Sequence, residues 1–299
     1  MSKSIWSVFL DICSINGLPF SHCGNYGKKQ YPLTRDPIDV IIPCIEKDKD
    51  TLDACIRGIR KNGTNINRIF VISPYPITTE AEWFDEKHYP FNKMDIARII
   101  YGSDEEALRH QNEWDRIGWI LQQLLKLYAP LVIPGISPNV LALDADTIFL
   151  NPVTFLNASN GALFCTAGEW HSPYFIHGAK LLPGFTRIQP SHSGITHHML
   201  FQKSILEDFW NTIESIHHLP GWEAYCRCIE RETLYYAPCS EYELYFNYAL
   251  AHTDQVEIRP LKWDNISYLS QIKNYQNLGC HDIAFMLSKV CVYSLRSQL

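Results

Sequence analysis

The sequence predicts an α/β fold, a single domain in which a mostly parallel mixed sheet is flanked by helices. Two short runs rich in β-branched apolar residues, 38–42 and 66–73, have the pattern of strands that are buried in a parallel sheet. A segment with helical periodicity separates them, so the three together form a βαβ unit. Such a sheet binds its ligands at the carboxyl ends of its strands, and we look for the functional residues there.

The composition indicates a globular chain with enough apolar residues for a large core. Of the 299 residues, 46% are hydrophobic and 19% are charged. The formal charge of −6, without a block of lysine or arginine, argues against nucleic acid as a partner. Asp11 interrupts the apolar stretch 5–18, so we expect neither a signal peptide nor an integral membrane segment. Because the ten cysteines are scattered, we expect reduced thiols and a cytoplasmic location.

The first half of the chain is organised around the βαβ unit. We expect residues 1–36 to be an N-terminal extension that wraps the domain or caps an edge, and residues 37–299 to form the domain itself. Asp50 or Thr51 can cap the helix predicted over 52–61, which joins the two strands.

Further elements follow in order. Residues 74–102 are expected to be a long connection with a short helix near 80–84. Helix formers dominate from about residue 104, and a core-facing helix with the sequence EWDRIGWILQQLLKLYA is expected over 113–129, ending before Pro130. The remaining expectations are a strand over 140–143, a strand over 161–167, a loop over 170–190, helices over 205–216 and 241–252, a strand over 256–260, a turn at 262–264 and a last apolar helix after 282.

Two aspartates end the central apolar run of the chain. Residues 140–143 stop at Asp144 and Asp146, and apolar residues resume at Ile148. Side chains at i and i+2 of an extended chain point the same way, so the pair can present oxygens to one hard divalent cation, Mn²⁺ or Mg²⁺. Such an ion would neutralise a diphosphate leaving group. The alternative is a simple turn, because aspartates often bond their own backbone at strand ends.

Several motifs together resemble a known fold family. The βαβ organisation, GWILQQLLKL at 118–127 and VLALDADTIFLNP at 140–152 resemble the sugar-nucleotide-binding core of GT-A fold glycosyltransferases, which is Rossmann-like. THHMLF at 196–201 and SEYELYFNY at 240–248 are similar to a family of uncharacterised glycosyltransferase-like proteins of the DUF6492 type. The likeness spans about residues 37–285.

The resemblance implies roles for matching positions. Asp144 and Asp146 would bind the divalent ion and the donor diphosphate, and a C-terminal histidine, for which His281 is the candidate, would be the third ligand. The residues after the first strand would line the nucleoside, namely Pro43, Cys44 and Ile45.

Other polar residues are candidates on chemical grounds. Arg116 and Lys126 lie in the predicted long helix, and as cations they suit a diphosphate, although a solvated stripe would look the same. Glu241 and Glu243 open a helix and are candidates for the base that deprotonates an acceptor, with Glu241 preferred; a helix N-terminus also favours carboxylates without any catalytic role. Candidates for acceptor binding are His197, His198 and Trp170.

These expectations converge on a metal-dependent hexosyl- or pentosyltransferase. Its donor would be a nucleotide-sugar, with UDP as the expected nucleotide, and its acceptor a hydroxyl of a glycan or small molecule. One alternative is a haloacid-dehalogenase-type phosphatase, but Thr147 directly follows the second aspartate and the further acidic pair of that family is missing. The other alternative is a non-enzymatic carbohydrate- or cation-binding protein, which the βαβ start disfavours.

Overall fold

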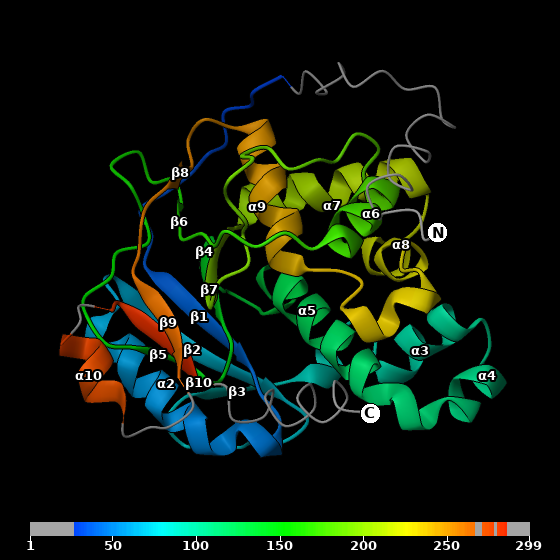
Figure 1. The fold of residues 1–299 in the computed structure, drawn as a ribbon, viewed down its shortest axis with the longest axis horizontal. Helices are drawn as coiled ribbons and strands as arrows, with labels where there is room; N and C mark the ends of the chain where they lie inside the picture. The colour runs from blue at the N-terminus through cyan, green and yellow to red at the C-terminus, as the bar shows by residue number, and fades with distance from the viewer. Residues whose placement is uncertain (1–26, 267–270, 278–279, 286–299) are drawn as a thin grey trace, which may run out of the picture.

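The computed structural model of the chain describes residues 27–266, 271–277 and 280–285. At its centre lies a five-stranded sheet in the order β3-β2-β1-β4-β7 (Figure 1). The prediction of a single α/β domain with a mostly parallel sheet is confirmed, because β1 to β4 are parallel and β7 alone is antiparallel in this sheet. The bounds are Ile38–Pro43 for β1, Ile66–Ser73 for β2, Glu82–Asp85 for β3, Asn139–Leu143 for β4 and His198–Gln202 for β7.

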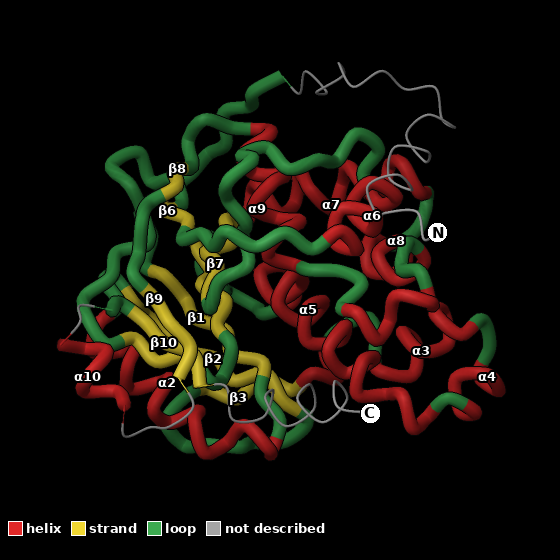
Figure 2. Tube along the Cα trace, viewed as in Figure 1, coloured by secondary structure: helices red, strands yellow, loops and turns green. Residues whose placement is uncertain are grey.

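Helices cover both faces of this sheet. The connection from β1 to β2 runs through α2 (Lys49–Asn62), and the connection that returns to β4 runs through α5 (Trp114–Val132). The two connections step across the sheet in opposite directions, so right-handed crossovers place α2 and α5 on opposite faces (Figure 1). On the α5 side lie α7 (Lys203–His217) and α9 (Glu241–His252), and Figure 2 shows how helices fill this half of the molecule.

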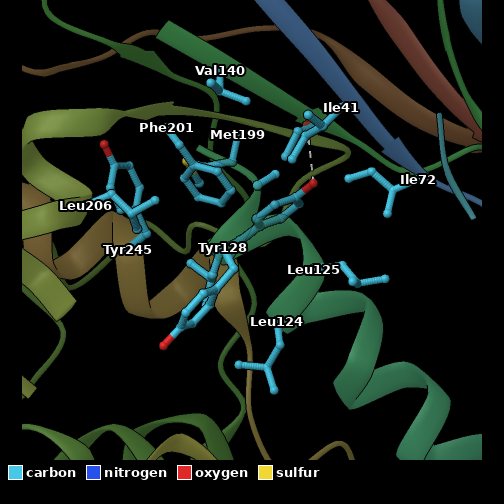
Figure 3. Packing of buried hydrophobic residues seen from close by; sticks show 14 of the residues in the cluster. Ile41, Ile72, Leu124, Leu125, Tyr128, Val140, Met199, Phe201, Leu206 and Tyr245 are labelled. Atoms are coloured by element: carbon cyan, nitrogen blue, oxygen red, sulfur yellow. Dashed lines mark hydrogen bonds between the residues drawn. The ribbon is translucent and has the colours of Figure 1, made fainter. Parts of the chain in front are cut away.

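The main core lies between α5 and the sheet. Leu125 is almost fully buried and points from α5 towards Ile72 of β2 (Figure 3). Tyr128 of the same helix points away from the sheet, and its hydroxyl accepts from the Trp222 amide at 2.8 Å. One hydrophobic cluster contains these residues and extends from Tyr31 to Val256, as expected for a single domain.

A second, smaller sheet follows directly after the aspartate pair. It has the order β5-β10-β9, with β5 at Thr147–Phe149, β10 at Asp282–Phe285 and β9 at Trp263–Ile266. Helix α2 packs closely on β5, because a Cβ atom at Gly58 would lie 2.9 Å from the backbone nitrogen of Phe149. A short pair of strands, β6 (Leu163–Phe164) and β8 (Glu257–Ile258), completes the strands among the described residues.

Some predicted elements differ in the structure. The prediction of a helix near 80–84 is wrong, because β3 forms there as a short, half-exposed edge strand. Its four residues are too few to show whether the hydrophobic pattern is that of a strand or of a helical turn. The strand expected over 161–167 shrinks to β6, which lies outside the main sheet, and the turn at 262–264 runs into β9. The loop expected over 170–190 contains α6 (Ser172–Leu181).

Helix boundaries also differ. Helix α2 begins at Lys49, so Asp50 and Thr51 lie inside it and neither is its cap. The helix expected over 113–129 forms as α5, which begins one residue later but continues through Pro130 to Val132; α4 (Asp104–Arg109) and a 3-10 turn precede it. Three further helices were not predicted, α3 (Lys93–Tyr101), α8 (Gly221–Arg227) and α10 (Ile272–Asn277).

The described part of the N-terminal extension is tied to the domain. Lys29 forms an ion pair with Asp208 of α7 at 2.7 Å, and the Tyr31 hydroxyl donates to the same carboxylate at 2.6 Å. The Tyr31 amide donates to the Gln255 side chain at 2.7 Å, just beyond α9. Residues 1–26 of the extension, and most of the last helix expected after residue 282, lie outside the described residues.

Within the part of the chain that the structure describes, no helix has both the length and the apolar character needed to cross a bilayer.

Candidate active site

The aspartate pair lies at the carboxyl edge of the parallel strands. Ile41 of β1 pairs with Ala142 of β4, so the two strands end side by side at Pro43 and Leu143. Strands β2 and β3 end at the same edge, because Pro43 pairs with Ile72, and Ser73 pairs with Asp85. Strand β7 begins there. The loop after β1 and the turn after β4 are therefore neighbours.

This edge is also where the strand order reverses. From β1 the chain moves outward to β2 and β3, and it then crosses back over the sheet to β4 on the other side of β1. Open α/β sheets bind ligands in the crevice outside such a switch point. The two adjacent segments are the loop after Pro43 and the turn at Asp144 to Asp146.

The aspartates occupy a tight turn. The Thr147 amide donates to the Asp144 carbonyl at 3.0 Å, so the extended conformation that we expected for the pair is wrong. Both side chains are half-buried. Cys55 Sγ of α2 donates to the Asp144 carbonyl at 3.7 Å. Burial, followed by the charges of Asp146 and Asp144, raises the pKa of this thiol well above its ordinary value. The two aspartates thus lie in a turn that contacts α2, and do not alternate along a strand.

Lys126 connects the pair to a second carboxylate. Its ammonium lies 2.8 Å from Asp144 Oδ1 and 2.7 Å from Glu241 Oε1, and the residue is only 3% exposed. Burial by itself would lower the pKa of Lys126, but the charges of Asp144 and Glu241 outweigh burial and raise this pKa well above its ordinary value. Lys126 is therefore a charged group inside the protein, held by carboxylates from two distant segments.

Two further side chains complete the surroundings of this ammonium. Gln122, one helical turn before Lys126 on α5, donates to Asp144 Oδ1 at 3.3 Å. The ring of Tyr242 faces the Lys126 ammonium at 4.5 Å, and its hydroxyl donates to the Ala142 carbonyl at 3.3 Å. The sequence contained a signal for Gln122, because its spacing of four places it on the same helix face as Lys126. It contained none for Tyr242, one of many aromatic residues.

The two glutamates of α9 differ in their surroundings. Ser240 caps the helix as predicted, accepting from the Glu243 amide at 3.2 Å. Glu243 is 1% exposed, and its carboxylate accepts from Ser193 Oγ at 2.6 Å, from the Gly194 amide at 3.0 Å and from Asn247 at 3.0 Å. These contacts anchor the 193–194 loop, which is a structural role. Glu241 is the glutamate that the fold brings to the aspartates.

The residues after β1 lie at this edge as expected. Cys44 is buried, and burial, with smaller effects from Asp48 and Glu46, raises the pKa of its thiol to about 12. Ile45 is 49% exposed, and Tyr75, which follows β2, exposes a similar fraction of its side chain. An apolar and aromatic surface is thus available beside the aspartate turn.

The two histidines at the start of β7 are occupied by other contacts. The ring of His197 packs edge-on against Trp263 at 4.6 Å, and its Nε2 lies 3.2 Å from Asn265 Oδ1. The ring of His198 is buried between Phe149 and Phe155, at 5.3 and 5.6 Å. Both are close to the aspartates in the sheet, but their side chains are directed into packing contacts.

Trp170 is an exposed side chain on the loop that precedes α6. It is 52% exposed, stacks on Phe175 with ring centres 4.1 Å apart, and has the Arg187 guanidinium 5.3 Å from its ring. The ring of Tyr174 of α6 packs edge-on against His171 at 4.5 Å, and burial, followed by the charges of Glu169 and Glu241, raises the pKa of Tyr174. Sequence reasoning did not distinguish Tyr174 from the other aromatic residues of this stretch.

The structure does not bring Arg116 or His281 to the pair. Arg116 precedes Lys126 by ten residues of α5, about 15 Å along the helix axis. His281 accepts from the Leu150 amide at 2.8 Å, and Leu150 lies about 13 Å of extended chain beyond Asp146. Across the described residues, no group of three histidine, cysteine, aspartate or glutamate side chains is arranged to hold a metal ion.

Comparisons with known proteins identify a family and some distant structural neighbours. A model of the DUF6492 family, described as a family of unknown function, matches residues 52–272. A comparison with curated proteins gave no match.

Among solved structures, the chain is similar to the bifunctional glycosyltransferase WbbM in its apo form, with a TM-score of 0.39 and 13% identity, over 87% of this chain and 47% of that chain. It is similar to mouse xyloside xylosyltransferase 1 in its apo form, with a TM-score of 0.39 and 12% identity, over 83% of this chain and 96% of that chain. The chain thus spans about half the length of WbbM, and likenesses of this size carry no information about activity.

Proposed function

The chain belongs to the DUF6492 family, and we propose that it is a metal-dependent glycosyltransferase of the GT-A type. In this proposal a sugar moves from a nucleotide diphosphate, with UDP as the expected nucleotide, to a hydroxyl of a glycan or small molecule. One observation supports the proposal above the others: two carboxylates follow a fully buried strand at the switch point of a mostly parallel sheet. Hard cations and diphosphates are the ligands that such carboxylates suit.

The residues present fit a divalent cation that the substrate helps to hold. Mg²⁺ is usually bound by one or two carboxylates together with substrate phosphates, so Asp144 and Asp146 suffice without a third protein ligand. When bound, the ion supplies Lewis-acid stabilisation of the leaving diphosphate.

The neighbouring residues suggest where the two substrates lie. We place the donor nucleoside against the loop that follows Pro43, where Ile45 and Tyr75 expose apolar surface. We place the acceptor near Trp170, because an exposed indole face can cover the apolar C–H surface of a sugar ring. Glu241 is the proposed base in an inverting transfer, since it lies beside the aspartate turn whereas Glu243 is held by its own loop contacts.

Binding and turnover test this proposal together. Calorimetry with UDP and GDP, each with Mn²⁺, Mg²⁺ or EDTA, should show nucleotide binding that requires the metal. A panel of nucleotide-sugars should then reveal metal-dependent hydrolysis that Asp144→Ala and Asp146→Ala abolish. The matched control is Asp254→Ala, an exposed carboxylate in a surface ion pair with Lys28, which should behave as the unmodified chain does.

The same experiments distinguish the alternatives. Undiminished donor hydrolysis in both aspartate variants, or in EDTA, would contradict the transferase. Release of phosphate from a simple aryl phosphate, without nucleotide binding, would indicate the phosphatase. Binding of a sugar without any effect of nucleotide would indicate a carbohydrate-binding protein, although the mostly parallel sheet differs from the small all-β units typical of such proteins.

A further inference from the structure

Lys126 lies at the junction of three segments that are far apart in the sequence. It belongs to α5, and its ammonium contacts Asp144 in the turn after β4 and Glu241 in the first turn of α9. Tyr242 supplies the third side through its ring face. Lys126 Nζ thus contacts both Asp144, on the proposed donor side, and Glu241, the proposed base that acts on the acceptor.

The burial of this lysine shows what it can and cannot do. An ammonium that is removed from water costs several kcal/mol unless carboxylates and hydrogen bonds replace its hydration. At 3% exposure, Lys126 obtains that replacement from Asp144 and Glu241. A contact with a substrate phosphate would require it to give up one of these partners, so we do not place it on the diphosphate.

The charges in this group are unequal in number. Asp144, Asp146 and Glu241 contribute three formal negative charges, and Lys126 contributes one positive charge. The Lys126 ammonium lies 2.8 Å from Asp144, so its positive charge opposes the binding of a second cation at that carboxylate. Two carboxylates that share one ammonium are close neighbours, and without the ammonium between them they would repel each other.

We propose that Lys126 is a positioning residue and internal counter-ion that holds Asp144 and Glu241 in one arrangement and, through its positive charge beside Asp144, limits the affinity of the aspartate turn for a divalent cation. The proposal rests on the proposed function, because it assigns a purpose to that site. It differs from phosphate binding by Lys126 in a measurable way: a counter-ion affects the binding of the metal alone, before any nucleotide is present.

The test compares three variants. Lys126→Met removes the charge and keeps the length of the side chain, and Lys126→Arg keeps the charge. Lys126→Met/Glu241→Gln removes one charge of each sign, which protects the fold if the single variant is unstable. The matched control is Lys180→Met, which removes a half-exposed lysine that pairs with Glu230 at 2.7 Å.

Calorimetry with Mn²⁺ alone, and kcat and KM for the donor, are the measurements. We expect Lys126→Met to bind Mn²⁺ about tenfold more tightly, because the site gains a net negative charge, and to lose about 100-fold in kcat, because the carboxylates are displaced. Lys126→Arg should keep the original Mn²⁺ affinity and recover part of kcat. The double variant should regain the Mn²⁺ affinity of the unmodified chain but not its kcat.

The outcomes separate the two proposals. If Mn²⁺ affinity in Lys126→Met is unchanged or weaker, or if only KM for the donor rises, Lys126 is not a counter-ion and the inference is overturned. If the unmodified chain binds neither Mn²⁺ nor a nucleotide diphosphate, the proposed function itself fails. A loss of kcat in Lys180→Met as large as in Lys126→Met would likewise count against a specific role of Lys126.

Discussion

The two ends of the parallel sheet each carry a buried pairing of an aspartate with a cation, and the two pairings differ in their balance. At the amino end, Asp39 of β1 is fully buried and accepts four hydrogen bonds, from the Arg68 side chain at 2.7 Å, the Arg68 amide at 3.1 Å, Asn67 at 2.9 Å and the Ser137 amide at 2.9 Å. At the carboxyl end, one ammonium serves both Asp144 and Glu241. Donors are abundant around Asp39, whereas carboxylates are in excess around Lys126.

The difference separates a structural carboxylate from a binding site. Burial would raise the pKa of Asp39, but the hydrogen bonds from Arg68 and Ser137 outweigh burial and hold this pKa below its usual value. Asp39 thereby joins β1 to β2 and to the segment that enters β4. At the other end, Asp144 and Glu241 share the Lys126 ammonium, and Asp144 also accepts from Gln122 at 3.3 Å.

The largest expected effect is the loss of activity in Asp144→Asn. Removal of the proposed metal ligand should reduce nucleotide-sugar hydrolysis by about 1000-fold, because Lewis-acid stabilisation is worth several kcal/mol. The free energy of unfolding should change by less than about 1 kcal/mol, since asparagine still offers an oxygen to Lys126. Activity assays and urea denaturation on the same preparation check both values. If the free energy of unfolding fell by more than the activation free energy rose, Asp144 would be a structural residue, as we infer for Asp39, and our assignment would be wrong.

Asp39→Asn should show the opposite behaviour. We expect the free energy of unfolding to fall by about 3 kcal/mol, because Arg68 loses its buried partner and one amide hydrogen of asparagine faces other donors. The activity per folded molecule should stay unchanged. Urea denaturation and an assay normalised to the folded fraction test this, with Asp254→Asn as the surface control.

A smaller effect is expected at Gly58, where α2 packs against β5. In Gly58→Ala the new Cβ would lie 2.9 Å from the Phe149 nitrogen and 3.1 Å from its carbonyl oxygen, so α2 or β5 must move. We expect a loss of about 2 kcal/mol in the free energy of unfolding and a reduction in activity, because β5 directly follows the aspartate turn. If stability falls while the activity of the folded protein is retained in full, α2 does not position the turn.

The smallest expected effect is a difference in acid sensitivity. Because the pKa of Asp39 is lower in the folded state than in the unfolded state, Asp39 stabilises the fold fully above the unfolded pKa. That stabilisation is lost as the pH falls below about 4 and through the lower, folded pKa. The free energy of unfolding of Asp39→Asn should therefore depend less steeply on pH in this range. Parallel slopes for the two proteins would exclude a lowered pKa at Asp39.

The strands and helices of the main sheet could be predicted because their signals are local. Strands β1 and β2 appear as short runs rich in β-branched apolar residues, and α9 begins at a serine cap followed by glutamates. Strand β3 was predicted as a helix. Its four half-exposed residues are too few to distinguish the alternation of polar and apolar residues in a strand from the periodicity of a helix. Helix α5 passes through Pro130 because its apolar face continues to pack beyond the proline, which a local rule about proline does not include.

The site could be predicted only in part. The aspartates were found because two carboxylates interrupt an apolar run. The contact between Lys126 and Glu241 joins residues 115 positions apart, and no local pattern encodes such a contact. His281 was expected at the metal because it lies near the C-terminus, but the pairing of β10 with β5 sets its place, and strand register follows from the folded sheet. Helix geometry alone would have separated Arg116 from Lys126, since ten residues of helix span about 15 Å.

The order of strands in the small sheet has a consequence for the biosynthesis of the protein. Strand β10 lies between β5 and β9 and is the neighbour that both share. Because a ribosome makes the chain from its N-terminus, β5 leaves the ribosome long before Asp282 to Phe285 exist. The main sheet and its helices can therefore form first, whereas β5 can pair with β10 only after β10 has been synthesised. On a nascent chain the small sheet beside the aspartate turn would be among the last parts of the described fold to be completed.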